Sequence, residues 1–354
     1  MNRLLPAVLI VLTLVLASAL AAAEPTTFKG PGTIRAVAFS PNGELLAYGG
    51  EVPLPDGHYE RGEVVLWDVA KAQKRHVLAG HPGFVSALAF SPDGRLLVSG
   101  GRQWQATPDD ERQNVKVWDV GSGREVTTLL GHGASVTDVA FAPDGKTLAS
   151  SAMDGTVKLR LVDRDWRVRA TLKPPTWETR KEPVFHLAYD PGVQWLAAGL
   201  SGGTIEIWDV KTLRMKHKLR AHDTKNYGVA VAVTPQGKTL IATTPEAVQF
   251  WDTESFRIRN TVPVTPKPWP LAISRDGRWL ATGVDKGWDQ PSQVIIRDTT
   301  SGKEMTVLGG HEKSVTSLAF SPDGKWLASG SPDKTAKLWP LYEIAARQPD
   351  EEKR

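Results

Sequence analysis

Cysteine is absent from this 354-residue chain, and other features that would mark a particular chemistry are missing too. Without cysteine the protein cannot form disulfides, metal–thiolate sites or a thiol nucleophile. The sequence also contains no HExxH motif and no glycine loop that would cradle a phosphate. The formal net charge is +4 at pH 7, too small and too scattered to indicate a nucleic-acid partner. The function must therefore rest on other features of the chain.

An apolar run lies at the N-terminus. Arg3 precedes Leu4–Leu16, which is apolar apart from Thr13, and Ala21–Ala23 offers a small-residue cleavage site. This layout predicts a secretory signal peptide over residues 1–23. The alternative is an uncleaved membrane anchor, because the segment is nearly long enough to cross a bilayer. Either interpretation predicts an exported, periplasmic or extracellular protein that touches a membrane only through this segment.

One pattern recurs along residues 24–342. Its clearest copy is Gly310–Trp339, where short apolar runs are separated by tight turns such as Ser321–Gly324. The first turn ends at Gly43, Gly94, Gly145, Val193, Gly237, Gly277 and Gly324. The third run ends at Trp67, Trp118, Arg160, Trp208, Trp251, Arg297 and Trp339. Both series have seven members spaced 40 to 51 residues apart, and runs this short between Pro/Asp/Gly turns predict antiparallel strands.

These repeats resemble the WD-repeat β-propeller family. Gly-His precedes three of them, at His81, His132 and His311, and several third runs end in Trp-Asp. The resemblance implies an all-β, seven-bladed propeller of four-stranded antiparallel blades. The last repeat has no outer strand after Trp339, and Thr26–Lys29 matches the missing strand. We therefore expect the N-terminal strand to close the last blade, with residues 343–354 as a charged C-terminal tail.

The resemblance also implies a structural tetrad of His, Ser, Asp and Trp in each blade. His311, Ser329, Asp333 and Trp339 form the complete set. Other blades keep only part of it, and blade three places Arg160 where tryptophan is expected. These residues could be mistaken for a catalytic triad, but a triad has no reason to recur in several blades. We interpret them as structural.

Three repeats have lengthened loops between their second and third strands, within residues 48–67, 99–118 and 282–297. In a propeller these loops share one face, called the top face here, with the connections that lead into each blade. Aromatic and acidic residues on such loops are typical of a recognition surface. The predicted partner-binding residues are His58, Tyr59, Trp104, Asp109, Asp110, Trp177, Trp269 and Trp288. Blade seven, with short loops, should form an open step with Trp104 and Trp288 on either side.

The sequence favours a non-catalytic scaffold of the cell envelope or periplasm that binds a protein or peptide through this top face. The alternative is an exported hydrolase or lyase with its site in the central depression of the same face. Neither the Asp56, His58, Glu60 alternation nor the run Asp109–Glu111 has the spacing of a known metal site. We therefore expect no metal, no cofactor, no nucleic-acid partner and a monomeric, non-enzymatic protein.

Overall fold

The computed structural model describes residues 24–30, 32–53, 61–102, 115–163, 165–174, 181–224, 227–264, 267–284 and 286–341. The predicted signal peptide and the charged tail at 343–354 lie outside these residues. Within the described part of the chain, no helix has the length and apolarity needed to cross a membrane.

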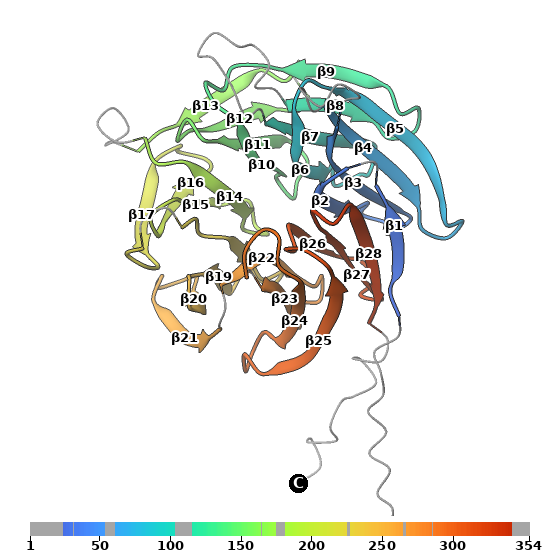
Figure 1. Cartoon of the computed structure of the whole chain (residues 1–354). Coiled ribbons are helices and arrows are strands. Elements are labelled where there is room, and N and C mark those ends of the chain that lie inside the picture. The colour runs from blue at the N-terminus through green and yellow to red at the C-terminus, as the bar shows by residue number, and fades with distance from the viewer. Residues whose placement is uncertain are drawn as a thin grey trace, which may run out of the picture.

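Seven antiparallel sheets of four strands each are arranged around a central axis (Figure 1). The predicted seven-bladed propeller is therefore confirmed. Blades one to three contain β2 (Ile34–Phe39), β3 (Leu45–Val52), β4 (Arg61–Asp68), β5 (Gln73–His81); β6 (Phe84–Phe90), β7 (Leu96–Arg102), β8 (Val115–Asp119), β9 (Glu125–Leu129); β10 (Val136–Phe141), β11 (Thr147–Ala152), β12 (Val157–Leu161) and β13 (Val168–Leu172).

Blades four to seven contain β14 (Val184–Tyr189), β15 (Trp195–Leu200), β16 (Thr204–Asp209), β17 (Met215–Arg220); β18 (Val231–Val233), β19 (Thr239–Thr243), β20 (Ala247–Asp252), β21 (Ile258–Pro263); β22 (Pro268–Ile273), β23 (Trp279–Val284), β24 (Ser292–Asp298), β25 (Glu304–His311); β26 (Ser317–Phe320), β27 (Trp326–Gly330), β28 (Thr335–Pro340) and β1 (Thr26–Lys29). The first strand of each blade is innermost and the fourth lies at the rim, as β17 and β21 show at the outer edge of the ring in Figure 1.

The turns between first and second strands follow from their sequence. In blade seven the Ser321 hydroxyl donates to the Asp323 carboxylate at 2.6 Å, and the Trp326 amide donates to the Ser321 hydroxyl at 2.9 Å. Gly324 takes a φ of 69°, a conformation that glycine adopts without a steric penalty. The Ser-Pro-Asp-Gly sequence therefore fixes a tight hairpin turn.

The N-terminal strand closes the ring, as predicted. β1 pairs antiparallel with β28, with Phe28 opposite Ala336. The Phe28 side chain is buried and contacts Tyr48 and Trp67 of blade one, with ring centroids 6.3 and 4.6 Å away. This strand therefore completes blade seven and also joins it to blade one.

Candidate functional site

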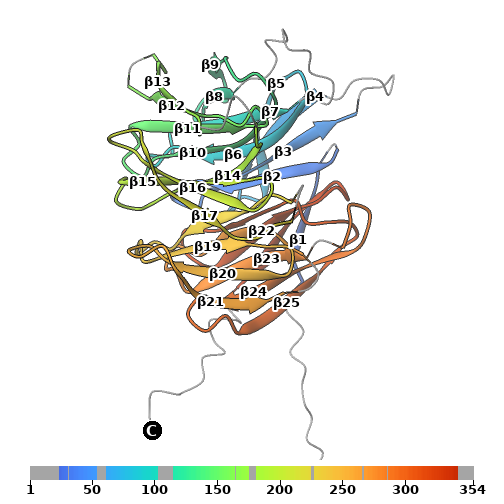
Figure 2. The ribbon, with the colours of Figure 1, turned by 90° about the vertical axis from the view of Figure 1, so that its left-hand side faces the viewer.

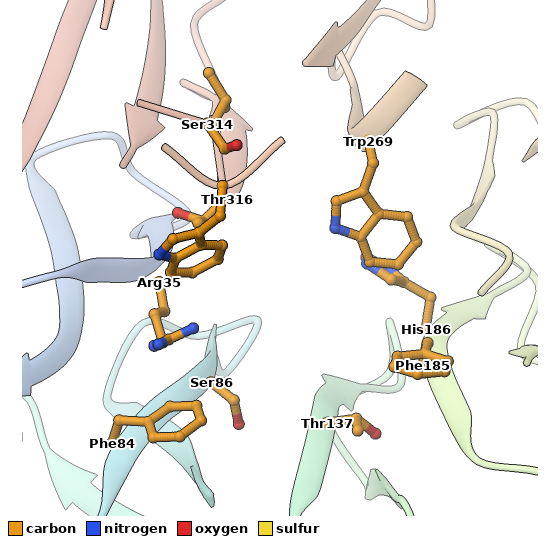
Figure 3. A pocket seen from close by; sticks show the side chains of 11 residues that line it. Arg35, Phe84, Ser86, Thr137, Phe185, His186, Trp269, Ser314 and Thr316 are labelled. Carbon is orange, nitrogen blue, oxygen red and sulfur yellow. The ribbon is translucent and has the colours of Figure 1, made fainter. Parts of the chain in front are cut away.

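A cavity of about 320 Å³ opens at the centre of the top face (Figure 3). Four of its lining residues stand at register shifts near the start of an inner strand, where one residue has no partner on the second strand. These residues are Arg35, Ser86, Thr137 and Phe185. Trp269 occupies a similar irregularity in β22. A β-bulge of this kind redirects a side chain, and here it directs side chains into the mouth of the central channel.

Arg35 forms the charged side of this cavity. Its guanidinium donates from Nε and Nη2 to the Glu51 carboxylate at 3.0 to 3.2 Å. The Arg35 Cζ atom lies 4.2 Å from the ring centroid of Phe84 and 4.7 Å from that of Trp288. The guanidinium is therefore stacked on two aromatic rings and neutralised by a buried carboxylate, an arrangement that fixes its position.

Trp288 reaches Arg35 from the long loop of blade six. The Ser314 amide donates to the Trp288 carbonyl at 3.3 Å, and the Ser314 hydroxyl donates to the Gly287 carbonyl at 2.7 Å. Asp289 pairs with Lys313 at 2.7 Å. This loop thus lies over the start of blade seven, where the sequence predicted an open step. The Trp288 side chain remains 46% exposed, so much of its surface is open to a partner.

His186 and Trp269 form the opposite side of the cavity (Figure 3). Their rings are 4.9 Å apart and nearly perpendicular. The His186 Nδ1 atom lies 3.7 Å from the Asp138 carboxylate, which also accepts the Leu187 amide at 2.8 Å. Burial raises the pKa of the Asp138 carboxyl, and the nearby imidazole opposes that rise.

The hydroxyl groups of the cavity have their protons committed. Ser86, Thr137, Ser314 and Thr316 each donate to a backbone carbonyl at 2.5 to 2.7 Å. They therefore offer oxygen lone pairs to a ligand. Among the described residues, no hydroxyl of this cavity donates to His186, so the nucleophile–base contact expected of an acyl-transfer site is not formed there.

The predicted tetrad residues of blade seven form one hydrogen-bonded chain. The Ser329 hydroxyl lies 2.8 Å from His311 Nε2 and accepts the Trp339 indole N–H at 2.8 Å. His311 Nδ1 lies 2.8 Å from the Asp333 carboxylate. Burial opposes ionisation of Asp333, yet its hydrogen bonds to His311 and neighbouring groups hold its pKa well below the usual range.

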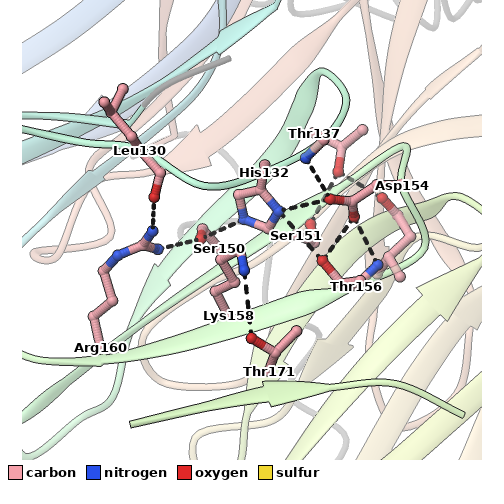
Figure 4. A network of polar contacts seen from close by, with 12 residues as sticks. Leu130, His132, Thr137, Ser150, Ser151, Asp154, Thr156, Lys158, Arg160 and Thr171 are labelled. Atoms are coloured by element: carbon pink, nitrogen blue, oxygen red, sulfur yellow. Dashed lines mark hydrogen bonds and ion pairs between the residues drawn. The ribbon is translucent and has the colours of Figure 1, made fainter. Parts of the chain in front are cut away.

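Blade three contains a variant of this chain (Figure 4). His132 and Ser150 are 2.8 Å apart, and His132 Nδ1 lies 3.3 Å from Asp154. Arg160 takes the place of tryptophan and donates to the Ser150 hydroxyl at 3.2 Å and to the Leu130 carbonyl at 2.6 Å. The guanidinium thus keeps the hydrogen bond to serine that tryptophan makes in blade seven.

Of the predicted partner-binding residues, Trp269 and Trp288 are brought together at this cavity. The other six, His58, Tyr59, Trp104, Asp109, Asp110 and Trp177, lie outside the described residues. Sequence reasoning missed Arg35 and His186. Aligning the inner strands would have revealed Arg35, because the corresponding positions are Ser86, Thr137 and Thr316.

The fold and this cavity define the chain as a seven-bladed propeller with an aromatic, charge-compensated site at its axis. The family pattern "WD domain, G-beta repeat" matches residues 23–68, 72–119, 123–160, 173–209 and 302–340, more than half of the chain. The protein belongs to the WD40 repeat family. The matches leave out residues 210–301, which hold blade five and the first three strands of blade six.

Several curated proteins are similar in sequence. "Cell division cycle 20.1, cofactor of APC complex" of Arabidopsis thaliana is 26% identical over 294 residues, covering 79% of this chain and 60% of that protein. "Periodic tryptophan protein 2" of the same plant is 28% identical, covering 80% and 31%. "Nuclear distribution protein PAC1" of Arthroderma otae is 30% identical, covering 53% and 44%. The chain thus spans 60% or less of the length of these relatives.

These relatives contradict the predicted exported, periplasmic or extracellular location. They are plant and fungal proteins named for the cell-division cycle and nuclear distribution, and such names point to the cell interior. The signal-peptide pattern at residues 1–23 misled that prediction, because a charged and then apolar N-terminus alone does not establish export. The relatives likewise give no support to an exported member of the family.

Proposed function

We propose that this protein is a non-catalytic scaffold that binds a protein or peptide segment at the cavity on its top face. The observation that carries the proposal is the half-exposed Trp288, held in place by Arg35 and by the backbone of blade seven. A fixed aromatic side chain loses little conformational freedom when a partner covers it, which favours binding. The predicted loop residues His58, Tyr59, Trp104, Asp109, Asp110 and Trp177 would extend this surface.

Two further observations support binding rather than catalysis. The Arg35 guanidinium of the cavity is already paired with the Glu51 carboxylate at 3.0 Å. The relative named a cofactor of the APC complex acts, by that name, with a protein assembly. A protein partner fits both, since the cavity offers aromatic surface and hydrogen-bond acceptors on a rigid ring of strands.

A site-specific crosslinking experiment tests the proposal. A photoreactive benzoylphenylalanine at position 288 should capture discrete proteins from extract of the source cells. The same group at position 166, in the turn between β12 and β13 on the opposite face, serves as the control. We expect crosslinks from position 288 alone. Crosslinks from position 166 alone would show that the binding face is the other one.

The affinity of the captured partner then gives a quantitative measure. Truncating a buried aromatic anchor costs about 2 kcal/mol or more, which corresponds to a roughly 30-fold weaker Kd. Trp288→Ala should show this loss, whereas Trp166→Ala should bind like the parent protein. An unchanged Kd for Trp288→Ala would contradict the assignment of this cavity.

A further inference from the structure

A cation–threonine contact recurs in the outer part of three blades, two, three and seven. Three blades place a lysine on the third strand opposite a threonine of the outer strand. The Nζ-to-hydroxyl distances are 2.8 Å for Lys116 and Thr128, 3.4 Å for Lys158 and Thr171, and 3.1 Å for Lys337 and Thr27. Because these three blades share the contact, differences around it can be compared between them.

In blades two and six a carboxylate lies beside a cationic side chain of the third strand. In blade two, Glu125 accepts from Lys116 Nζ at 2.8 Å and stands opposite Trp118 in the register. In blade six, Glu304 stands opposite Arg297 in the same register and lies 3.6 Å from its guanidinium. The first position of the outer strand is thus the place from which a glutamate neutralises cations on the third strand.

Blade three has valine at this position. Val168 stands opposite Arg160, as Glu125 stands opposite Trp118. Arg160 is 2% exposed, and its acceptors in the described part of the chain are neutral, the Ser150 hydroxyl and the Leu130 carbonyl (Figure 4). Lys158 contacts the Thr171 hydroxyl. Within the described ranges, neither cation forms an ion pair with a carboxylate.

The surroundings of Lys158 and Arg160 add to this excess of positive charge. Burial, followed by the positive charge of Arg160, lowers the pKa of Lys158. The acid whose charge acts on Lys158 is Asp154, but its carboxylate is already bonded to His132 and to the Gly133 amide. A buried cation without a counter-charge is costly, so an added carboxylate would be favoured here.

Exposed apolar side chains border the same place. Val168 is 43% exposed and Leu130, whose carbonyl binds Arg160, is 46% exposed. β13 is the edge strand of blade three (Figures 1 and 2), so its outer backbone groups are unpaired within that sheet. Edge strands accept an added strand by main-chain hydrogen bonding. Cations, apolar side chains and an open strand edge therefore meet at one site.

We propose that the rim of blade three binds an acidic, extended segment of a protein partner, whose glutamate or aspartate takes the place that Glu125 holds in blade two. This surface is separate from the cavity of the top face. The partner's carboxylate would neutralise Lys158, its backbone would pair with β13, and its apolar side chains would cover Val168 and Leu130.

A short labelled peptide tests this directly. The probe is fluorescein-Gly-Glu-Val-Glu-Val-Glu-amide, and the control peptide has glutamine in place of each glutamate. Fluorescence anisotropy with the whole protein should show the glutamate peptide binding at least tenfold more tightly than the glutamine peptide. That preference should shrink as salt is raised, because screening weakens contacts between partly exposed charges.

Variants of the chain identify the site. Val168→Glu supplies the carboxylate from the chain itself, so affinity for the glutamate peptide should fall at least tenfold. Val168→Gln has the same size without the charge and should keep the affinity. Lys158→Met should lose it by removing the cation. Glu125→Val leaves Lys116 without its acid, so the stoichiometry should rise from one peptide to two.

Several outcomes would overturn the proposal. These are no binding of the glutamate peptide, equal binding of both peptides, or unchanged affinity in Val168→Glu and Lys158→Met. Competition by a single-stranded oligothymidylate as effective as the peptide would show a general polyanion site instead. Melting curves confirm that each variant is folded, and Val168→Glu should melt no lower than the parent protein. A failure here leaves the crosslinking result at position 288 unaffected.

Discussion

Blade five has lost the serine of the tetrad, and restoring it should stabilise the protein. Ala242 stands where Ser329 stands in blade seven, because Leu240 pairs with Trp251 as Leu327 pairs with Trp339. In blade five the Trp251 indole N–H and His222 Nε2 are buried and have no hydrogen-bond partner among the described residues.

The expected gain follows from these two groups. His222 Nδ1 accepts the Thr224 amide at 3.1 Å, so Nε2 carries the ring proton and both orphaned groups are donors. A serine hydroxyl at position 242 has two lone pairs and can accept from both. Each buried unsatisfied group costs about 1–3 kcal/mol. After the cost of burying a new hydroxyl, we expect Ala242→Ser to raise the free energy of unfolding by about 1–2 kcal/mol.

Urea denaturation and thermal melting measure this gain. For a domain of this size, a stabilisation of about 1 kcal/mol raises the Tm by only about 2 °C, so the urea midpoint is the more sensitive measure. Ser329→Ala is the reciprocal change in blade seven, and it should cost about 1–3 kcal/mol by orphaning His311 and Trp339. An Ala242→Ser variant no more stable than the parent would refute the assignment of position 242 as the vacant tetrad position.

Three further predictions concern stability. Phe28→Ala should lower the free energy of unfolding by about 3–5 kcal/mol, because the Phe28 side chain joins blades seven and one. Thr26→Ala on the same strand should lower it by less than about 0.5 kcal/mol, and equal urea midpoints for the two variants would contradict this role of Phe28. The pKa of Asp154 is held at about 2, because its hydrogen bonds to His132 and Thr156 outweigh the effect of its burial. The roughly 2 kcal/mol that this carboxylate contributes to the free energy of unfolding is therefore present above pH 4 and lost as the pH falls toward 2. Asp154→Asn should flatten that part of the acid-unfolding curve, and an identical slope in the variant would contradict this. Asp333→Ala should lower the free energy of unfolding by about 1–3 kcal/mol while leaving the Kd of the crosslinked partner unchanged, and a stable variant that binds nothing would reverse the structural role.

The repeated part of this fold could be read from the sequence because it depends on local chemistry. The Ser321–Gly324 turn is held by hydrogen bonds from its own side chains. The amino-acid sequence of such a turn therefore predicts where it lies in each blade. The closing strand was predicted for the same reason, since Thr26–Lys29 matches the outer strands of other repeats. Neither prediction needed knowledge of contacts between distant residues.

The cavity was less accessible to sequence reasoning because its parts belong to different blades. Nothing in the sequence around Glu51 indicates its partner, whereas the structure places it 9% exposed against Arg35. The sequence predicts Trp288 as a top-face residue, but its contact with Arg35 depends on a loop that crosses blade seven. Such a crossing leaves no periodic signal, and only the assembled ring shows it.

The pairing of β1 with β28 also determines when the ring of blades can close during folding. Lys337 and Thr27, which touch in the closed ring, are separated by 310 positions along the chain. Joining segments that far apart costs about 5 kcal/mol in chain entropy. During synthesis, blades one to six can form as they leave the ribosome, but blade seven waits for the last strand. Until then β1 has no partner strand and Phe28 has no sheet to join, so a nascent or truncated chain would be prone to associate with other chains.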